Sequence, residues 1–172
     1  MINAGVSVIS KNGLNKCSID AVSAHTGCAK GLINYHFGTK RGLLERIAQR
    51  IRDDRHDAVL GALVPGGSMA LDALWLVMTA GASSGRTRAW LALLAHPPTT
   101  PEAQPTGAQI RSLRITVAKA LGVPEARIDP TLLQAGLEGI EVRLQCGVDP
   151  SEARESYDRF WLALLSHDFS GD

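Results

Sequence analysis

Two glycines, Gly27 and Gly38, divide residues 18–63 into two short helical segments and one long segment. Ser18 and Thr39 stand directly before the first and third segments, where a hydroxyl can accept a hydrogen bond from an unpaired backbone N–H group. The second segment, at about residues 29–36, lies between the two breaks. Short helices joined by a glycine turn are typical of a helix-turn-helix, whose second helix can enter the major groove of DNA. This pattern constrains the fold more than any other stretch.

The rest of the chain is also predicted to be helical. Apolar residues recur at the three- and four-residue spacing of a helix at about 2–11, 40–63, 69–82, 86–95, 110–121, 130–146 and 150–167. Asp129 and Asp149 each precede a proline, which is a frequent start of a helix. The stretch at 69–82 is almost wholly apolar and predicts a helix that is buried on most of its surface. No stretch alternates as a strand does, so we predict an all-α fold, with a loop at 96–105.

Charge is distributed unevenly along the 172 residues. Residues 1–52 contain eight Lys or Arg and two Asp or Glu, a net charge of +6, whereas residues 53–172 carry a net charge of −5. A basic first third indicates contact with a polyanion, although chance clustering on a solvated surface gives the same count. We predict an N-terminal domain at residues 1–45 and a second helical domain at residues 46–172.

Other classes of protein find little support in the sequence. No apolar run approaches ~18 residues, and the N-terminus lacks the basic region of a signal peptide, so we expect a cytoplasmic protein without a membrane span. Cys17, His25, Cys28 and His36 lie close together, but without the ligand spacing of a zinc finger or ribbon. We find neither a glycine-rich phosphate loop nor a nucleophile elbow. We therefore expect no enzyme activity, no metal and no cofactor.

Residues 18–44 resemble the N-terminal domain of the TetR family of transcriptional regulators. The residues that match the family pattern are Ser18, Ile19, Val22-Ser23, Thr26-Gly27-Cys28-Ala29, Gly31-Leu32-Ile33-Asn34-Tyr35-His36-Phe37, Lys40 and Leu43-Leu44. Within the family, the sequence of this stretch is most similar to the branch that contains repressors of glycine-betaine synthesis genes. The sequence Glu-Gly-Ile-Glu-Val-Arg at 138–143 adds to this resemblance. Two positions depart from the family: Ala29 replaces a usual Ser, and Asn34 replaces a usual Tyr.

The resemblance and the chemistry of the side chains together predict a DNA-binding surface. Lys30 and Asn34 can donate hydrogen bonds to base edges, and Leu32 can contact a thymine methyl group. Backbone phosphates accept hydrogen bonds from hydroxyl, imidazole and ammonium groups. Ile33 and Phe37 are expected in the core. The predicted DNA-binding residues are Ser18, Ala29, Lys30, Leu32, Asn34, Tyr35, His36 and Lys40.

The second domain is predicted to bind a small molecule and to form a homodimer. Its tryptophans and methionines favour a core, but they also fit an apolar pocket between helices. The candidate pocket residues are Trp75, Met78, Trp90, Leu94, His96, Leu113, Leu137 and Glu138. The last two helices are expected to pair with their copies in a second chain. The candidate interface residues are Leu133, Leu137, Ile140, Leu144, Phe160 and Leu164.

The resemblance implies a homodimeric repressor that binds a palindromic, double-stranded operator and is released by an unknown small-molecule effector. An activator, or a regulator that binds DNA without an effector, is a first alternative. A helical ligand-binding or protein-interaction module that has lost DNA binding is a second. Gel-shift measurements against DNA flanking the coding region separate these hypotheses.

Overall fold

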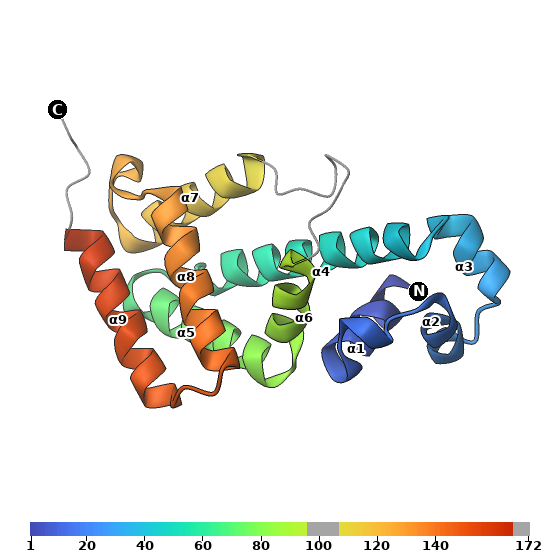
Figure 1. Cartoon of the computed structure of the whole chain (residues 1–172). Coiled ribbons are helices and arrows are strands. Elements are labelled where there is room, and N and C mark those ends of the chain that lie inside the picture. The colour runs from blue at the N-terminus through green and yellow to red at the C-terminus, as the bar shows by residue number, and fades with distance from the viewer. Residues whose placement is uncertain (96–106, 167–172) are drawn as a thin grey trace. The chain divides into compact units, whose positions relative to one another are not determined.

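The computed structural model describes residues 1–95 and 107–166, and these ranges contain helices but no strand (Figure 1). This confirms the predicted all-α fold. The α-helices are α1 (Ile2–Asn12), α2 (Ile19–Thr26), α3 (Lys30–Phe37), α4 (Lys40–Ala62), α5 (Gly67–Ser83), α6 (Arg86–Leu94), α7 (Gly107–Leu121), α8 (Pro130–Gln145) and α9 (Pro150–Ser166). Two short 3₁₀ helices that the sequence did not predict, η1 (Leu14–Lys16) and η3 (Glu125–Arg127), precede α2 and α8. The loop predicted at 96–105 lies outside the described residues.

The chain forms two compact units. Unit 1 comprises residues 1–55 and, among the described residues, 83–95; unit 2 comprises residues 56–82 and 107–166. These units differ from a division after residue 45, because α6 packs against α1 and η1 although it lies far from them in the sequence. The long helix α4 contributes Leu43, Ile47 and Ile51 to the core of unit 1 and Val59 and Ala62 to that of unit 2.

The core of unit 1 depends on a close approach of α1 to α4. A Cβ atom on Gly5 would lie 2.3 Å from Cδ1 of Ile47, so only glycine fits at this position of α1. Ile9 and Ile47 are fully buried there. Trp90 brings α6 into the same core, with the Arg55 guanidinium 5.6 Å from the centre of its ring.

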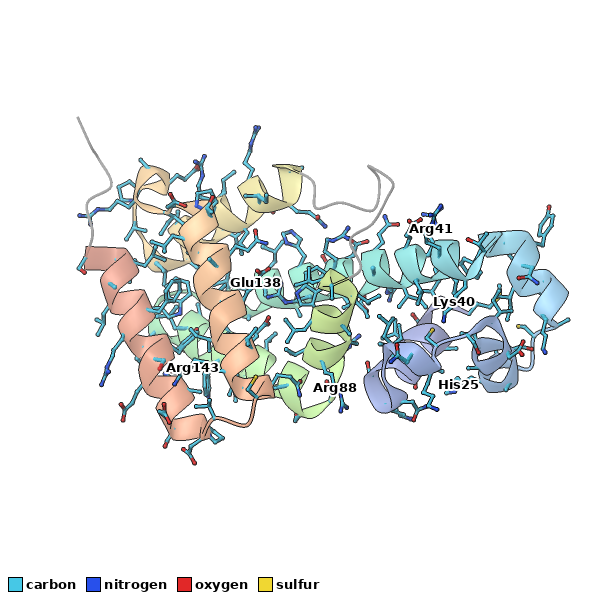
Figure 2. The ribbon with its side chains drawn as sticks, viewed as in Figure 1. His25, Lys40, Arg41, Arg88, Glu138 and Arg143 are labelled. Atoms are coloured by element: carbon cyan, nitrogen blue, oxygen red, sulfur yellow. The ribbon has the colours of Figure 1, made fainter. Side chains whose placement is uncertain are left out.

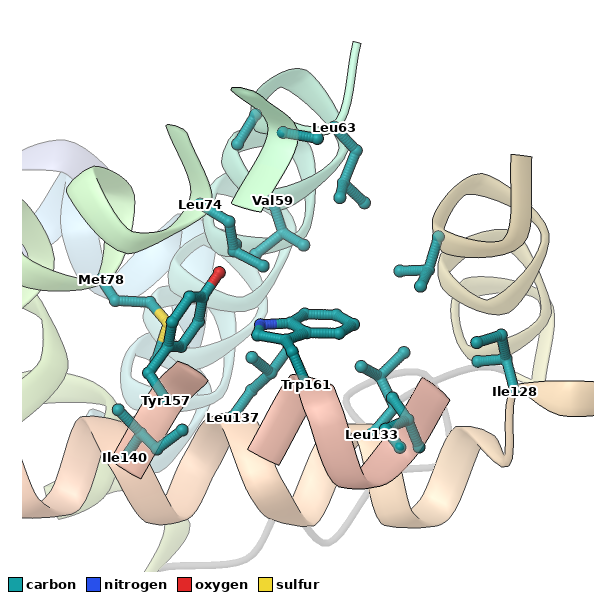
Figure 3. Close-up of a cluster of buried hydrophobic side chains, with 14 of the residues drawn as sticks. Val59, Leu63, Leu74, Met78, Ile128, Leu133, Leu137, Ile140, Tyr157 and Trp161 are labelled. Carbon is teal, nitrogen blue, oxygen red and sulfur yellow. The ribbon is translucent and has the colours of Figure 1, made fainter. Parts of the chain in front are cut away.

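The core of unit 2 is larger and gathers around the aromatic side chains of α9 (Figure 3). Tyr157 is fully buried, and its hydroxyl donates a hydrogen bond of 2.7 Å to the carbonyl oxygen of Leu71. Burial raises the pKa of the Tyr157 phenol. The Trp161 ring lies 6.0 Å from that of Tyr157, in an edge-to-face arrangement. Helix α5 covers this core with one face only.

The expectation that α5 would be buried on most of its surface is wrong. Ala70, Leu74 and Met78 are buried, but Met69 and Leu76 on the other side of the helix are 65% and 66% exposed. The composition of this stretch marks it as apolar without showing which side has a neighbour. The exposed Met69 and Leu76 form an apolar surface on α5 that no other part of residues 1–95 and 107–166 covers.

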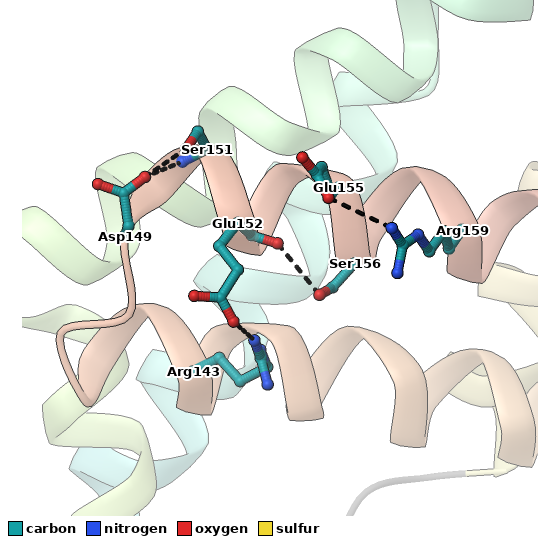
Figure 4. A network of polar contacts seen from close by, with 7 residues as sticks. All are labelled: Arg143, Asp149, Ser151, Glu152, Glu155, Ser156 and Arg159. Carbon is teal, nitrogen blue, oxygen red and sulfur yellow. Dashed lines mark hydrogen bonds and ion pairs between the residues drawn. The ribbon is translucent and has the colours of Figure 1, made fainter.

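Helices α8 and α9 form an antiparallel hairpin whose ends are fixed by polar contacts (Figure 4). Asp149 accepts a 2.8 Å hydrogen bond from the backbone N–H of Ser151 and another from its hydroxyl. These hydrogen bonds lower the pKa of the Asp149 carboxyl. Arg143 of α8 donates a 2.7 Å hydrogen bond to Glu152 at the start of α9.

The residues predicted to contact a second chain pack instead within unit 2. Leu133, Leu137, Ile140 and Leu164 are at most 5% exposed, and Leu144 and Phe160 pack against the same core. A Cβ atom on Gly136 would lie 2.1 Å from the Phe160 ring, so this phenylalanine fills the space between α8 and α9. The apolar periodicity identified a buried face correctly, but the partner that buries it is the chain's own core.

Candidate nucleic-acid interface

Helix α3 is short and is anchored by a single apolar residue. Ile33 is fully buried in unit 1, and Phe37 is half-buried against the same core. The neighbouring side chains point outward: Tyr35 is 84% and Leu32 45% exposed. Lys30, Asn34 and His36 are exposed as well. An anchored helix that presents donors and a leucine on its free side suits insertion into a groove about 12 Å wide.

The turn that leads into α3 is held by hydroxyl groups. Gly27 takes the left-handed conformation with a φ of 70°, which ends α2. Thr26 donates through Oγ1 to the carbonyl oxygen of Val22 (2.8 Å) and accepts from the N–H of Cys28 (3.2 Å). The Ser23 hydroxyl donates to the carbonyl oxygen of Cys28 at 2.7 Å. These bonds fix the angle between α2 and α3, a role that the sequence had not indicated for either hydroxyl.

The start of α4 is fixed by a side-chain cap and by a close contact with the end of α3. Thr39 is the predicted cap, and its hydroxyl oxygen accepts a hydrogen bond of 3.1 Å from the N–H of Gly42. A Cβ atom on Gly42 would lie 2.3 Å from the carbonyl oxygen of Phe37, so the last turn of α3 touches the first turn of α4. Lys40 is therefore held on an exposed corner beside the end of α3 (Figure 2).

The positive charge of Lys40 also acts on a buried thiol, that of Cys17. Burial raises the pKa of the Cys17 thiol, and the charge of Lys40 opposes part of that rise. Cys17 itself is fully buried and cannot act as an exposed ligand or nucleophile. In residues 1–95 and 107–166, His, Cys, Asp and Glu side chains form no group of three or more that could hold a metal ion.

Lys30 does not stand alone on α3. Its ammonium group lies 2.8 Å from the carboxylate of Asp20, in the first turn of α2. Both side chains are exposed, at 61% and 69%. The sequence analysis did not single out Asp20, although an acidic residue ten positions before the predicted base-contacting lysine was visible. A base or phosphate must compete with this carboxylate for Lys30.

The predicted DNA-binding residues all lie in unit 1, in or beside α2, α3 and the first turn of α4, and they differ in exposure and in their contacts. Ser18 is half-buried, and its Oγ accepts a 3.0 Å hydrogen bond from the N–H of Ala21, so it acts as the cap of α2. Ala29 is exposed and supplies no side-chain cap to α3. Arg41 follows Lys40 in the first turn of α4, and its side chain is 75% exposed, but it was not among the predicted residues. Its position in the first turn of a helix that follows the glycine break was the available signal.

The predicted ligand-pocket residues belong to both units. Trp75, Met78, Leu113 and Leu137 belong to the core of unit 2, whereas Trp90 is buried in unit 1 and Leu94 is exposed there. Glu138 is half-buried and accepts a 3.0 Å hydrogen bond from Gln134 (Figure 2). His96 lies outside the described residues. The prediction grouped Trp75 and Trp90 because both are tryptophans. Trp75 belongs to unit 2, whereas Trp90 belongs to unit 1 because α6 packs with α1.

Known proteins resemble the N-terminal part of this chain in sequence. Residues 1–47 match the family model described as "Bacterial regulatory proteins, tetR family". The HTH-type transcriptional regulator BetI of Vibrio parahaemolyticus is 36% identical over 63 residues, which are 37% of this chain and 32% of that protein. The chain thus spans about a third of the length of this curated relative.

Two solved structures extend the likeness in fold to nearly the whole chain. One is a protein from Rhodococcus sp. described as a TetR-family regulator, with a TM-score of 0.72 and 20% identity over 96% of both chains. The other is the multidrug binding protein EbrR in complex with imidazole, with a TM-score of 0.63 and 22% identity over 92% of this chain and 86% of that one.

The anchored helix α3, its hydroxyl-bonded turn and the capped helix α4 define a helix-turn-helix domain of the transcriptional-regulator class. Residues 1–47 match the helix-turn-helix model of the TetR family, and the same part of the chain is similar to BetI, as the resemblance of residues 18–44 predicted. Among the described residues, none of the helices has the length and apolar character needed to cross a membrane.

Proposed function

We propose that this chain is a homodimeric repressor that reads a palindromic operator through α3 and leaves it when a small effector binds unit 2. The observation that carries the proposal is the orientation of α3. Ile33 is fully buried while Lys30, Leu32, Asn34, Tyr35 and His36 all face outward. These five side chains offer donors, an aromatic ring and an apolar contact on one free surface, as base and phosphate recognition requires.

The roles within this surface follow from position. Lys30 and Leu32 are proposed to face base edges because they lie in the first half of α3, which enters the groove in this motif, and Asn34 is proposed to do so because it lies one turn after Lys30. Tyr35, His36 and Lys40 are proposed to contact phosphates. Ala29 supplies no side-chain cap, so the N–H groups of Lys30 and Gly31 at the start of α3 are proposed to donate to a phosphate oxygen.

A homodimer requires an apolar surface outside the core, and α8 supplies one. Its exposed positions Leu132, Ala135, Gly139 and Val142 recur at spacings of three and four residues, which is the spacing of a helix-packing seam. Leu132 and Val142 are 43% and 40% exposed, and the small residues between them allow a second helix to approach closely. We propose this seam as the dimer contact, in place of the buried residues predicted from the sequence.

Two exposed helical glycines make a matched test of the dimer. A Cβ atom on Gly139 or on Gly61 of α4 would meet no other atom within 4 Å, so each accepts a large side chain in the folded protomer. Gly139→Arg is expected to yield monomers in analytical ultracentrifugation, whereas Gly61→Arg remains dimeric. A dimer that survives Gly139→Arg would exclude the α8 seam.

Effector binding is proposed for unit 2, where Trp75, Met78, Leu113, Leu137 and Glu138 gather around the core. The likeness in fold to EbrR, a multidrug binding protein solved with imidazole, supports a small-molecule site in a domain of this kind. An effector acts if it binds better to a dimer whose half-site separation differs from the ~34–36 Å of one DNA turn. A screen for compounds that lower operator affinity tests this step.

The experiment that tests the DNA-binding proposal is selection of DNA fragments by the purified protein, followed by sequencing. The expected result is enrichment of a palindromic sequence whose half-sites are one helical turn apart. Recovery of no common sequence would favour the alternative in which the chain is a helical binding module that no longer reads DNA.

A further inference from the structure

Unit 1 contains a cleft beside the middle of α4, away from the N-terminal end of that helix where Lys40 lies. The cleft has a volume of about 310 Å³ and is bordered by α1, by the second half of α4 and by the turn into α6. Its lining residues are Asn3, Val6, Ser7, Ser10, Lys11, Arg50, Asp54, Ser84 and Arg86. All of them belong to one compact unit.

The cleft carries an excess of positive charge around one carboxylate. Nε of Arg50 lies 2.8 Å from one oxygen of Asp54, and Nη2 of Arg86 lies 3.0 Å from the other. Lys11 has no ion-pair partner in the described part of the chain, which leaves the cleft with three cations against one anion. Each guanidinium uses one of its five N–H groups on Asp54, so further donors remain for an anion.

Helix α1 adds a row of donors, two of them uncharged, to the same cleft. Asn3, Ser7 and Lys11 follow each other at four-residue spacing, so their side chains lie on one face of the helix. Ser10 also lines the cleft, is 7% exposed, and has a buried Oγ without a hydrogen-bond partner among the described residues. A buried hydroxyl without a partner is costly, and a ligand oxygen is a partner that removes this cost.

The cleft is separate from the proposed DNA surface. Arg50 and Lys40 are ten residues apart on α4, which corresponds to about 15 Å along the helix axis. A phosphate held by Lys40 therefore does not reach Arg50. The cationic excess of the cleft can therefore be balanced only by another anion. The same anion would accept hydrogen bonds from the donors of α1 and from the Ser10 hydroxyl.

We propose that this cleft binds a small oxyanion, a phosphate or carboxylate group of a free metabolite. Lys11 and the free N–H groups of Arg50 and Arg86 hold the charge, and the hydroxyls of Ser7 and Ser10 donate to its oxygens. The occupied cleft links α1 and the start of α6 to α4. Because α1 and α4 form the core on which α3 rests, an occupied cleft makes the DNA-binding unit more stable.

The test measures the thermal unfolding of the full chain in sodium phosphate and in sodium succinate, each against sodium chloride of equal ionic strength. A ligand that binds only the folded state raises the Tm in proportion to ln(1 + [L]/Kd). The expected result is a concentration-dependent rise with at least one oxyanion beyond that in chloride. The comparison of the two salts shows which oxyanion the cleft prefers.

Three variants locate the effect. Lys11→Gln removes the unpaired cation and is expected to weaken the apparent affinity about two- to fivefold, as expected for the loss of one exposed ion pair. Ser7→Asp places a carboxylate in the cleft and is expected to abolish the rise. Lys16→Gln removes the same charge from η1, outside the cleft, and is expected to behave as wild type.

The proposal is overturned if the oxyanions give no rise beyond chloride. It is also overturned if Lys11→Gln and Ser7→Asp keep the wild-type rise, because the anions then bind elsewhere. Operator binding plays no part in this measurement, so its outcome is independent of the proposed function.

Discussion

Replacement of Asp20 by Asn is expected to strengthen DNA binding, because it removes the carboxylate that holds Lys30. The two side chains lie 2.8 Å apart and are both more than half exposed. Asn keeps the size of the side chain and loses its charge. Lys30 is then free to turn toward a base or phosphate, and a negative charge near the DNA backbone is lost at the same time.

The size of the effect follows from the exposure of the pair. Exposed ion pairs contribute about 0.2–1 kcal/mol, and this is the free energy that DNA must replace when it takes Lys30 from Asp20. An upper value of about 1 kcal/mol corresponds to about a fivefold gain in affinity. A much larger gain would mean that repulsion between Asp20 and phosphates outweighs its contact with Lys30.

Fluorescence anisotropy with a selected DNA fragment measures this change for Asp20→Asn, Lys30→Ala and the double variant. The gain from Asp20→Asn should nearly vanish when Lys30 is absent, because the effect acts through Lys30. An equal gain in both backgrounds would refute this reasoning and assign Asp20 a general repulsive role. A loss of affinity in Asp20→Asn would show that the carboxylate positions Lys30 productively.

Four further outcomes are expected. Ser18→Ala removes the cap of α2 and should lower the free energy of unfolding by about 0.5–2 kcal/mol in urea titrations, whereas an unchanged midpoint would exclude the cap. Ile33→Ala should cost about 2–5 kcal/mol and Ile33→Val about 0.5–1.5 kcal/mol; equal costs would contradict full burial of Ile33. Gly42→Ala should lower DNA affinity more than it lowers stability, because its Cβ would meet the carbonyl oxygen of Phe37 at 2.3 Å and displace α3 from α4; isotherms that match wild type would show that the junction adapts. The pKa of Tyr157 in the folded protein is raised above its ordinary value of 10.0, so its contribution to stability is fully present below pH 10.0 and falls as the phenol of the unfolded chain ionises above that pH. Tyr157→Phe should flatten this fall in unfolding free energies measured from pH 9 to 11. An unchanged slope would contradict burial of Tyr157 as its cause.

The helices and the helix-turn-helix were predictable from the sequence because their signals are local. Gly27 and Thr39 act on the residues next to them, and the structure shows a left-handed glycine and a hydroxyl cap at these positions. Asp129 and Pro130 likewise start α8, where the Asp129 carboxylate accepts from the N–H groups of Thr131 and Leu132. Such contacts span three residues and leave a direct trace in the sequence.

The partners of the helices were not predictable in the same way. The periodicity of α8 and α9 marks Leu133, Ile140 and Leu164 as buried, but a second chain and the chain's own core produce the same pattern. The pairing of α6 with α1 depends on contacts between residues about eighty positions apart, such as the 3.0 Å hydrogen bond from Arg88 to the carbonyl oxygen of Ser10. Trp75 and Trp90 were therefore assigned to one pocket although they lie in different units.

The outward direction of the side chains of α3 was predictable because it depends on one short helix. Burial of Ile33 fixes the outward direction of Lys30, Leu32 and Asn34 once the helix is known. Asp20 escaped prediction because its contact with Lys30 crosses from α2 to α3. The charges of the cleft were not predicted for the same reason, since Lys11, Arg50 and Arg86 come together only where α1, α4 and α6 meet in the folded unit.

The central claim is that the chain binds DNA through phosphate and base contacts made by α3 and the start of α4. The most direct measurement is the affinity for a selected fragment over a range of salt concentrations, for wild type and Lys40→Ala. We predict that log K falls linearly with log salt, by about 0.9 for each phosphate contacted, and that Lys40→Ala reduces this slope by about 0.9. Binding that does not respond to salt, or a Lys40→Ala variant with the wild-type slope and affinity, would contradict the claim.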